Sequence, residues 1–208
     1  MISVRRGLRA AVPTVAAFLC LVSASPSYPQ YPPGGGNQTP VIVSLITNQV
    51  AGQKFRISGR VQDNTPGSCT VALTGAAVQT LTCAADGTFD AVVNVPTLGA
   101  MTAKASDGVN ISTAVNRTLA NTAPGVMNFI AAHSEGNTLT LSGMVTDEAA
   151  PGLFVAVSGP GFDSSFSTVG ATGQFSITVP FITGFTGTAT ATVTDWYGAT
   201  GSATTLIN

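Results

Sequence analysis

The sequence predicts an all-β protein built from two tandem β-sandwiches of about seven strands each. Apolar and polar residues alternate with a period of two along most of the chain, and no window shows sustained helical periodicity. The chain also repeats itself: Ile57-Ser58-Gly59-Arg60-Val61-Gln62-Asp63 returns 84 residues later as Leu141-Ser142-Gly143-Met144-Val145-Thr146-Asp147. Self-similarity at such a period indicates two copies of one folding unit.

The first 40 residues are expected to lie outside the two copies. Residues 1–24 have the pattern of a signal peptide, because arginines precede a short apolar stretch and Val22-Ser23-Ala24 fits a signal peptidase site. That stretch is too short for a transmembrane helix, so we expect no membrane insertion after cleavage. Residues 25–40 hold five prolines and three consecutive glycines. They predict an exposed linker, which is either a tether or a disordered mature N-terminus.

The strands of the two copies follow from the alternation and from the turn signals between apolar runs. Repeat 1, residues 41–121, is expected to have strands near 41–47, 53–61, 69–74, 78–84, 88–95, 100–106 and 111–119. Repeat 2, residues 122–208, is expected to have strands near 126–132, 137–145, 153–158, 164–169, 174–179, 187–194 and 200–207. Seven short strands in each copy are typical of an immunoglobulin-like Greek-key β-sandwich.

The repeated Ser-Gly segment predicts which side chains face each core. In repeat 1, Phe55, Ile57 and Val61 share a face with Gly59, and basic residues alternate with them on the outer face. In repeat 2 the corresponding inner positions are Leu139, Leu141, Gly143 and Val145. A glycine in the middle of a strand predicts a bulge or a close approach by a neighbouring group.

Two cysteines remain once the signal peptide is removed, Cys69 and Cys83. With a turn at 75–77, antiparallel pairing sets position 69 opposite position 83 on consecutive strands. In an oxidising compartment this geometry predicts a disulfide, and the alternative is a pair of free buried thiols. Repeat 2 has no cysteines, and we expect Phe154 and Phe166 to fill the equivalent space.

Charge argues against a nucleic-acid partner. After removal of residues 1–24, five basic and nine acidic residues remain, a net charge of −4. Repeat 1 carries all the basic residues and has a charge of +1, whereas repeat 2 has five acids and no Lys or Arg. Such a surface cannot neutralise phosphates.

No catalytic constellation is recognisable, so we expect no enzymatic activity and name no catalytic residue. The sequence has no nucleophile-elbow motif, no metalloprotease His-Glu pair and no phosphate-binding glycine loop. His133 is the only histidine and is expected at the surface. Asp147 and Glu148 are adjacent and so cannot flank a glycosidic bond from opposite sides.

One end of repeat 2 gathers the candidate binding residues. Asp147, Glu148 and Asp195 follow strands whose ends meet in such a sandwich, and clustered carboxylates suit Ca²⁺. The alternative is that each Asp hydrogen-bonds its own turn, with no cofactor. Trp196 and Tyr197 in the same loops would either bind a sugar or pack against repeat 1. At the opposite end, the Phe residues of the loops either plug the core or form an adhesive tip.

The repeated motifs support a family resemblance. The Ser-Gly-Xaa-Val-Xaa-Asp strand, Asp86-Gly87-Thr88-Phe89 and the Val-Pro pairs resemble the tandem bacterial Ig-like repeats of secreted and surface proteins. The resemblance implies a secreted, non-enzymatic structural or adhesive protein at the cell surface or in the extracellular matrix. Its partners would be other surface proteins or polysaccharide. The alternative is a carbohydrate-binding accessory module that uses the end loops of repeat 2.

Overall fold

The structure, a computed structural model, describes residues 36–208, which belong to one compact unit, Gly34–Asn208. The expected signal peptide and residues 25–35 of the expected linker lie outside the described residues. Residues 36–40 have no regular secondary structure, and Pro40 at their end is buried.

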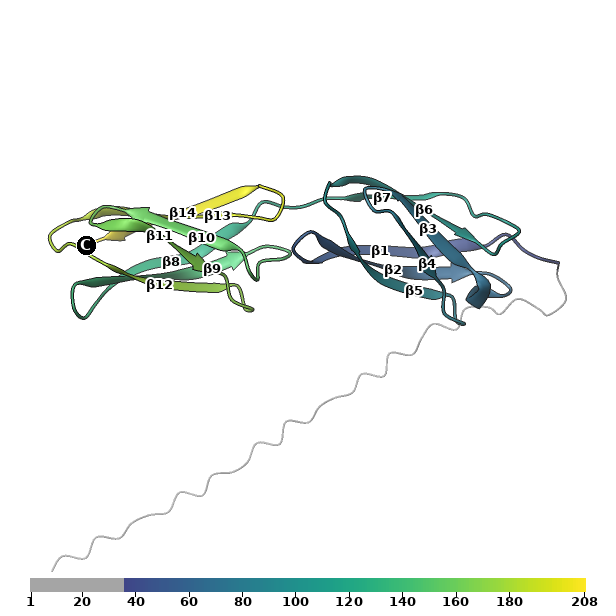
Figure 1. Cartoon of the computed structure of the whole chain (residues 1–208), viewed down its shortest axis with the longest axis horizontal. Helices are drawn as coiled ribbons and strands as arrows, with labels where there is room; N and C mark the ends of the chain where they lie inside the picture. Colours follow the sequence, from purple (N-terminus) through teal and green to yellow (C-terminus); the bar gives the residue numbers. More distant parts are fainter. Residues whose placement is uncertain (1–35) are drawn as a thin grey trace, which may run out of the picture. The chain divides into compact units, whose positions relative to one another are not determined.

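Fourteen strands make up most of the described chain (Figure 1). Those of repeat 1 are β1 (Val41–Ala51), β2 (Lys54–Gln62), β3 (Thr70–Gly75), β4 (Gln79–Thr82), β5 (Thr88–Asn94), β6 (Gly99–Ser106) and β7 (Val115–Leu119), with a short 3-10 helix η1 (Pro66–Ser68) before β3. Those of repeat 2 are β8 (Gly125–Ser134), β9 (Thr138–Thr146), β10 (Phe154–Gly159), β11 (Phe162–Thr168), β12 (Gln174–Pro180), β13 (Gly187–Thr194) and β14 (Thr200–Ile207).

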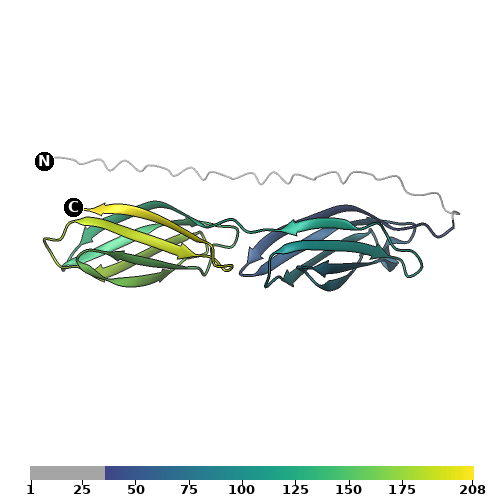
Figure 2. The same cartoon turned by 90° about the horizontal axis from the view of Figure 1, so that it is seen from above.

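Each repeat is a sandwich of a three-stranded and a four-stranded antiparallel sheet, and the turned view shows the two layers of each (Figure 2). Repeat 1 has the sheets β1-β2-β5 and β4-β3-β6-β7. Repeat 2 has the same strand orders in β8-β9-β12 and β11-β10-β13-β14. The predicted fold, two tandem all-β sandwiches of seven strands, is confirmed.

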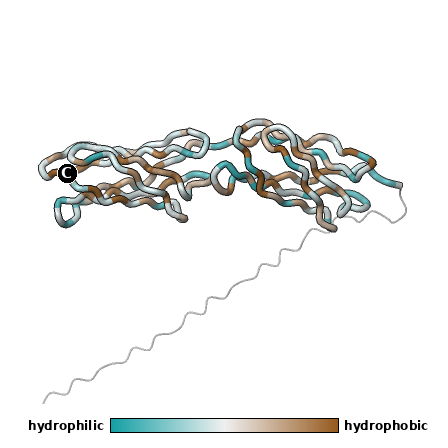
Figure 3. Tube along the Cα trace, viewed as in Figure 1, coloured by the Kyte–Doolittle hydropathy of each residue, from teal (hydrophilic) through white to brown (hydrophobic). Residues whose placement is uncertain are grey.

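The cores lie between the sheets, as the alternation predicts. Ile57, Val61, Leu139 and Leu141 are at most 1% exposed. Hydrophobic segments alternate with hydrophilic ones along the strands of both repeats (Figure 3). On the outer face of repeat 1, Arg56 on β2 forms an ion pair with Asp90 on β5.

The mid-strand glycines permit close approaches, as predicted. A Cβ atom on Gly59 would lie 2.2 Å from the backbone oxygen of Ser44 and 2.5 Å from Cζ of Phe89. A Cβ atom on Gly143 would lie 2.9 Å from two ring carbons of Phe175. The strands opposite, β1 and β8, each have a register shift near this point. In both copies, the glycine of the repeated Ser-Gly motif therefore lies close to a bulge in the neighbouring strand.

Two strand boundaries in repeat 1 differ from the prediction. Strand β1 continues to Ala51 because its hairpin with β2 closes at the Ala51–Lys54 pair. Strand β7 starts only at Val115: after the turn formed by Asp107, Ile111 makes an isolated bridge to Ser106, and regular pairing with β6 begins at Val115.

The prediction that Phe154 and Phe166 occupy the space of the cysteine pair is wrong. They are 64% and 69% exposed. The space is filled instead by Leu153 and Val169, each 2% exposed, and the N–H of Val169 donates to the oxygen of Leu153 as that of Cys83 donates to Cys69. The prediction assigned the wrong face of each strand to the core. Successive side chains point to opposite faces, and both faces of this segment carry apolar residues.

Candidate functional site

Asp195 organises the loop that follows β13. Its side chain is 7% exposed. Oδ1 accepts hydrogen bonds from the N–H groups of Tyr197 and Ala199 at 2.8 and 2.9 Å, and Oδ2 accepts one from Nδ2 of Asn121 at 2.6 Å. Asp195 therefore shapes its own turn and ties that turn to the segment that connects the repeats.

Trp196 and Tyr197 use their polar groups within the protein. The indole Nε1 of Trp196 donates to the backbone oxygen of Ala149 at 3.0 Å. The hydroxyl of Tyr197 donates to the backbone oxygen of Val95 at 2.8 Å, and its ring packs against the core of repeat 1. Burial raises the pKa of this hydroxyl, with the Asp195 carboxylate adding to the shift. Tyr197 thus packs against repeat 1, whereas the Trp196 indole bonds within repeat 2 and remains 38% exposed.

Asp147 and Glu148 differ in their surroundings. Oδ1 of Asp147 accepts the N–H of Ala149 at 2.8 Å, but Oδ2 is buried without a hydrogen-bond partner. Burial raises the pKa of Asp147, and the charges of Glu148 and Asp195 raise it further. Glu148 is exposed and lines an open hollow together with Gln49 of β1.

The predicted calcium site stays a proposal. Within residues 36–208, no three His, Cys, Asp or Glu side chains come together as metal ligands. Both oxygens of Asp195 already accept N–H donors, which argues against direct coordination by this residue. The observation in favour is that Oδ2 of Asp147 and Oδ1 of Asn121 are both buried without a partner.

An Asn–Asp pair recurs at the corresponding end of repeat 1, and sequence reasoning missed it. The pKa of Asp107 is lowered by hydrogen bonds from the N–H groups of Asn110 and Val109, and the side chain of Asn37 adds to the effect. Asn37 precedes Asn121 by 84 residues, the same spacing as in the Ser-Gly motif. An Asn-Xaa-Xaa-Pro segment before the first strand of each repeat was the available signal.

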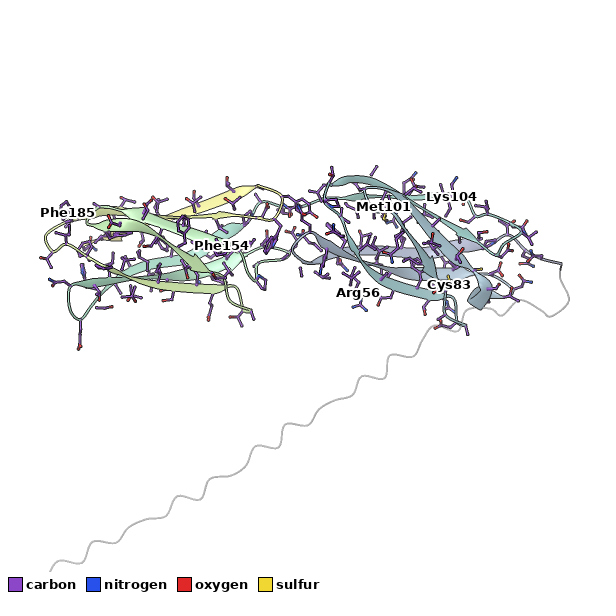
Figure 4. The ribbon with its side chains drawn as sticks, viewed as in Figure 1. Arg56, Cys83, Met101, Lys104, Phe154 and Phe185 are labelled. Atoms are coloured by element: carbon purple, nitrogen blue, oxygen red, sulfur yellow. The ribbon has the colours of Figure 1, made fainter. Side chains whose placement is uncertain are left out.

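The cysteines lie opposite each other in the predicted register. Val71 pairs with Leu81 and Leu73 with Gln79, and the N–H of Cys83 donates to the oxygen of Cys69 at 3.0 Å. Both side chains are buried, and their thiols are unbonded in this structure. Cys83 is labelled in Figure 4. Burial raises the pKa of Cys69 to about 11, and the charges of nearby acids add to the shift. Thiolate is the form that forms disulfides, so the raised pKa lowers the reactivity of the buried pair.

The far end of repeat 2 is closed by phenylalanines. Phe181 is 5% exposed, Phe162 packs partly buried against the core, and His133 contacts the Phe181 ring edge-on. Nε2 of His133 also lies 2.9 Å from the backbone oxygen of Asn208. Phe185 remains 48% exposed and is labelled in Figure 4. This end is therefore largely plugged.

The outer face of the four-stranded sheet of repeat 2 is the most distinctive surface of that repeat. Its outward positions carry mainly hydroxyl side chains, with the two exposed phenylalanines among them. We call it the hydroxyl face, and it consists of Phe154, Ala156 and Ser158 of β10, Ser164, Phe166 and Thr168 of β11, Thr188, Thr190, Thr192 and Thr194 of β13, and Thr200, Ser202, Thr204 and the exposed Leu206 of β14.

The edge of the hydroxyl face borders an open hollow. Thr168 lines this hollow together with Ser167, Gln174 and Ser176. The Ser167 hydroxyl donates to the backbone oxygen of Ser176 at 3.0 Å, which links β11 to the other sheet. Hydroxyl and amide groups therefore continue around the edge of the sandwich.

Comparison with known proteins shows similarity of fold only. No protein-family model and no curated protein matches the chain. A solved tetra-tandem repeat from the extending region of a large adhesion protein aligns over 81% of this chain and 48% of its own, with 23% identity and a TM-score of 0.39. A 1.5-MDa bacterial ice-binding adhesin aligns over 82% and 64%, with 16% identity and a TM-score of 0.38. The adhesin InvE of Yersinia pseudotuberculosis aligns over 84% and 62%, with 17% identity and a TM-score of 0.31.

This chain therefore spans from about half to under two thirds of the length of those structures. Among the described residues, no helix has the length and apolar character needed to cross a membrane.

Proposed function

We propose that this protein is a secreted, non-enzymatic structural or adhesive protein that acts at the cell surface or in the extracellular matrix. The observation that carries the proposal is that the described chain consists of two sandwiches joined by side-chain hydrogen bonds from Gln53 and Tyr197. Proteins of this kind present surfaces rather than reactive groups. Other surface proteins or polysaccharide are the proposed partners, and the surplus of acids makes nucleic acid an unsuitable one.

The hydrogen bonding of the acids supports a non-enzymatic role. Five aspartates each accept the backbone N–H of the residue two positions later, namely Asp63, Asp86, Asp107, Asp147 and Asp195. This is the Asx-turn arrangement, in which the carboxylate shapes a turn. Carboxylates used in this way are structural groups, which fits a scaffold rather than a catalyst.

A Cys69–Cys83 disulfide is part of the proposal, because the two residues are already paired across β3 and β4 and secretion would expose them to an oxidising compartment. Closing a loop of ~15 residues contributes about 3 kcal/mol in the chain-entropy model. The bond would stabilise repeat 1 alone, since Leu153 and Val169 occupy the equivalent positions in repeat 2.

Localisation and attachment test the proposed function. The native host should release or display a chain whose first residue is Ser25, as read by N-terminal sequencing of the extracellular fraction. Deletion of the gene should reduce attachment or matrix cohesion, and complementation should restore it. Recovery of the protein only in the cytoplasmic fraction with residues 1–24 intact would refute the proposal.

The carbohydrate-binding alternative at the end loops has its own test. The Trp196→Ala variant should lose any glycan binding that this loop provides. Because the polar groups of Trp196 and Tyr197 are used within the protein, we expect this variant to affect stability rather than binding.

A further inference from the structure

The register of the hydroxyl face places its two phenylalanines next to each other. Phe154 pairs with Thr168 and Ala156 pairs with Phe166, so the rings are diagonal neighbours on β10 and β11. Diagonal neighbours on one face have Cα atoms about 7–8 Å apart, within reach of aromatic side chains. At 64% and 69% exposure, both side chains stand in solvent on the same face, on neighbouring strands.

The rows of the sheet extend this pair into a polar surface. Phe154 also pairs with Thr194 on β13, which in turn pairs with Thr200 on β14. In the next row, Ala156 pairs with Thr192, and Thr192 pairs with Ser202. Each row therefore continues from an aromatic or small residue into hydroxyl groups that can both donate and accept hydrogen bonds.

Repeat 1 has no such aromatic pair on its equivalent face. Thr70 pairs with Thr82 and Ala72 pairs with Thr80, so threonines occupy the positions that correspond to Phe154 and Phe166. Lys104 also stands on that face, paired with Ala72, and is labelled in Figure 4. Since threonine suffices for the fold in repeat 1, the sandwich itself does not require the phenylalanines of repeat 2.

Large exposed aromatic rings lower the solubility of a protein, and a partner that covers them removes their contact with water. The residues of the hydroxyl face carry no charge, and among the five acids of repeat 2 only Asp163 lies on one of its strands, exposed near the start of β11. An uncharged surface offers no complement to a charged partner. It does complement a chain that has many hydroxyl groups, no charge and flat apolar ring faces.

We propose that the hydroxyl face binds a neutral polysaccharide, with Phe154 and Phe166 stacking on its sugar rings. The threonines of β13 and β14 then exchange hydrogen bonds with the sugar hydroxyls along the rows of the sheet. This site is separate from the Trp196 loop, and it specifies the partner class of the proposed surface or matrix function, on which it rests.

The test uses the mature secreted chain and four neutral probes: insoluble cellulose, insoluble chitin, and soluble xylan and dextran, with anionic alginate as the contrasting probe. Retention is measured by pull-down for the insoluble probes and by affinity electrophoresis for the soluble ones. We expect binding to at least one neutral probe and none to alginate. Absence of binding to all four, or preferential binding to alginate, would overturn the proposal.

A matched pair of variants assigns the binding to this face. Phe154→Thr/Phe166→Thr copies the residues of repeat 1, and threonine favours strands, so the fold should persist. Two lost stacking contacts should weaken binding by about tenfold or more. Ile130→Thr removes an apolar residue that is 56% exposed on the other sheet of repeat 2, and it should leave binding unchanged.

Four outcomes would contradict the proposal. Unchanged binding by the double variant would do so, as would an equal loss in the Ile130→Thr control. Self-association of the wild type that the double variant abolishes, without polysaccharide binding, would identify a second copy of this chain as the occupant. If the protein is found at the surface and cells attach normally with the double variant, this proposal fails while the proposed function stands.

Discussion

The Gly59→Ala substitution tests whether the repeated Ser-Gly motif is needed for the close approach of β1 to β2. The new methyl group would lie 2.2 Å from the backbone oxygen of Ser44 and 2.5 Å from Cζ of Phe89. Both distances are far below normal contact, and the nearer atom belongs to the backbone of β1. The strand must therefore move, because no side-chain rotation can remove the clash with Ser44.

The magnitude follows from two opposing effects. Overpacking of a core costs about 1–3 kcal/mol, and a clash with backbone belongs at the upper end of that range. Replacing glycine by alanine within a strand returns about 0.5–1 kcal/mol through reduced chain entropy. The net loss should be about 2 kcal/mol, which corresponds to a fall in melting temperature of about 8–16 °C for a domain of this size.

Gly143→Ala is the matched comparison in repeat 2. Its nearest contacts are ring carbons of Phe175 at 2.9 Å, and the nearest backbone atom, the oxygen of Met127, is 3.2 Å away. The ring can shift, so we expect a loss below about 1 kcal/mol. Gly36→Ala has no atom within 4 Å of the new methyl group and should be neutral.

Calorimetry of the mature chain with resolved transitions for the two repeats is the appropriate assay. The reasoning is refuted if Gly59→Ala melts within 2–3 °C of the wild type (about 0.5 kcal/mol), or if Gly143→Ala is the more damaging of the two.

Four further predictions concern the cysteines and the junction loops. Protein purified from an oxidising compartment should have a mass lower by two hydrogens, and reductant should lower the melting temperature of repeat 1; a mass that corresponds to two free thiols would contradict the disulfide. The Cys69→Leu/Cys83→Val variant copies the pair of repeat 2 and should melt cooperatively but become insensitive to reductant. Tyr197→Phe removes the hydrogen bond to Val95, which contributes about 1 kcal/mol, and should change the separation between the melting transitions of the two repeats; an unchanged separation would argue against coupling through this bond. Asp147→Asn should raise the free energy of unfolding at pH 7 by less than about 1 kcal/mol, because the raised pKa of Asp147 means that its charged form is penalised in the folded state. This gain should disappear as the pH falls through the raised pKa toward about 4. A Ca²⁺-dependent shift in melting temperature that the variant abolishes would instead support the calcium site.

The in-and-out pattern was most predictable where only one alternation was apolar. In Lys54–Gln62, apolar and basic residues alternate without ambiguity, and the burial of Phe55 and Ile57 followed. In the segment Leu153-Phe154-Val155 both alternations are apolar, so periodicity could not decide whether Leu153 or Phe154 faces the core. Phe154 was the predicted core residue, and the structure places its side chain in solvent.

The candidate site was predictable in position but not in its bonding. The order of strands in such a sandwich predicts that Asp147 and Asp195 lie at the same end, and the charge of Asp195 contributes to the raised pKa of Asp147. The 84-residue spacing of Asn37 and Asn121 is visible in the sequence, but spacing does not identify the hydrogen-bond partner of either amide. Their function depends on which carboxylate the folded chain brings within hydrogen-bonding distance.

The sequence alone determined the duplication, the two seven-stranded sandwiches, the core faces of β2 and β9 and the register of Cys69 with Cys83. These features depend on local alternation and on spacing, which are properties of the chain itself. The tertiary structure alone decided that Tyr197 bonds to Val95 and that Phe154 and Phe166 stand together on the hydroxyl face. Those relations join residues from separate strands and repeats, and packing of the whole sandwich selects them.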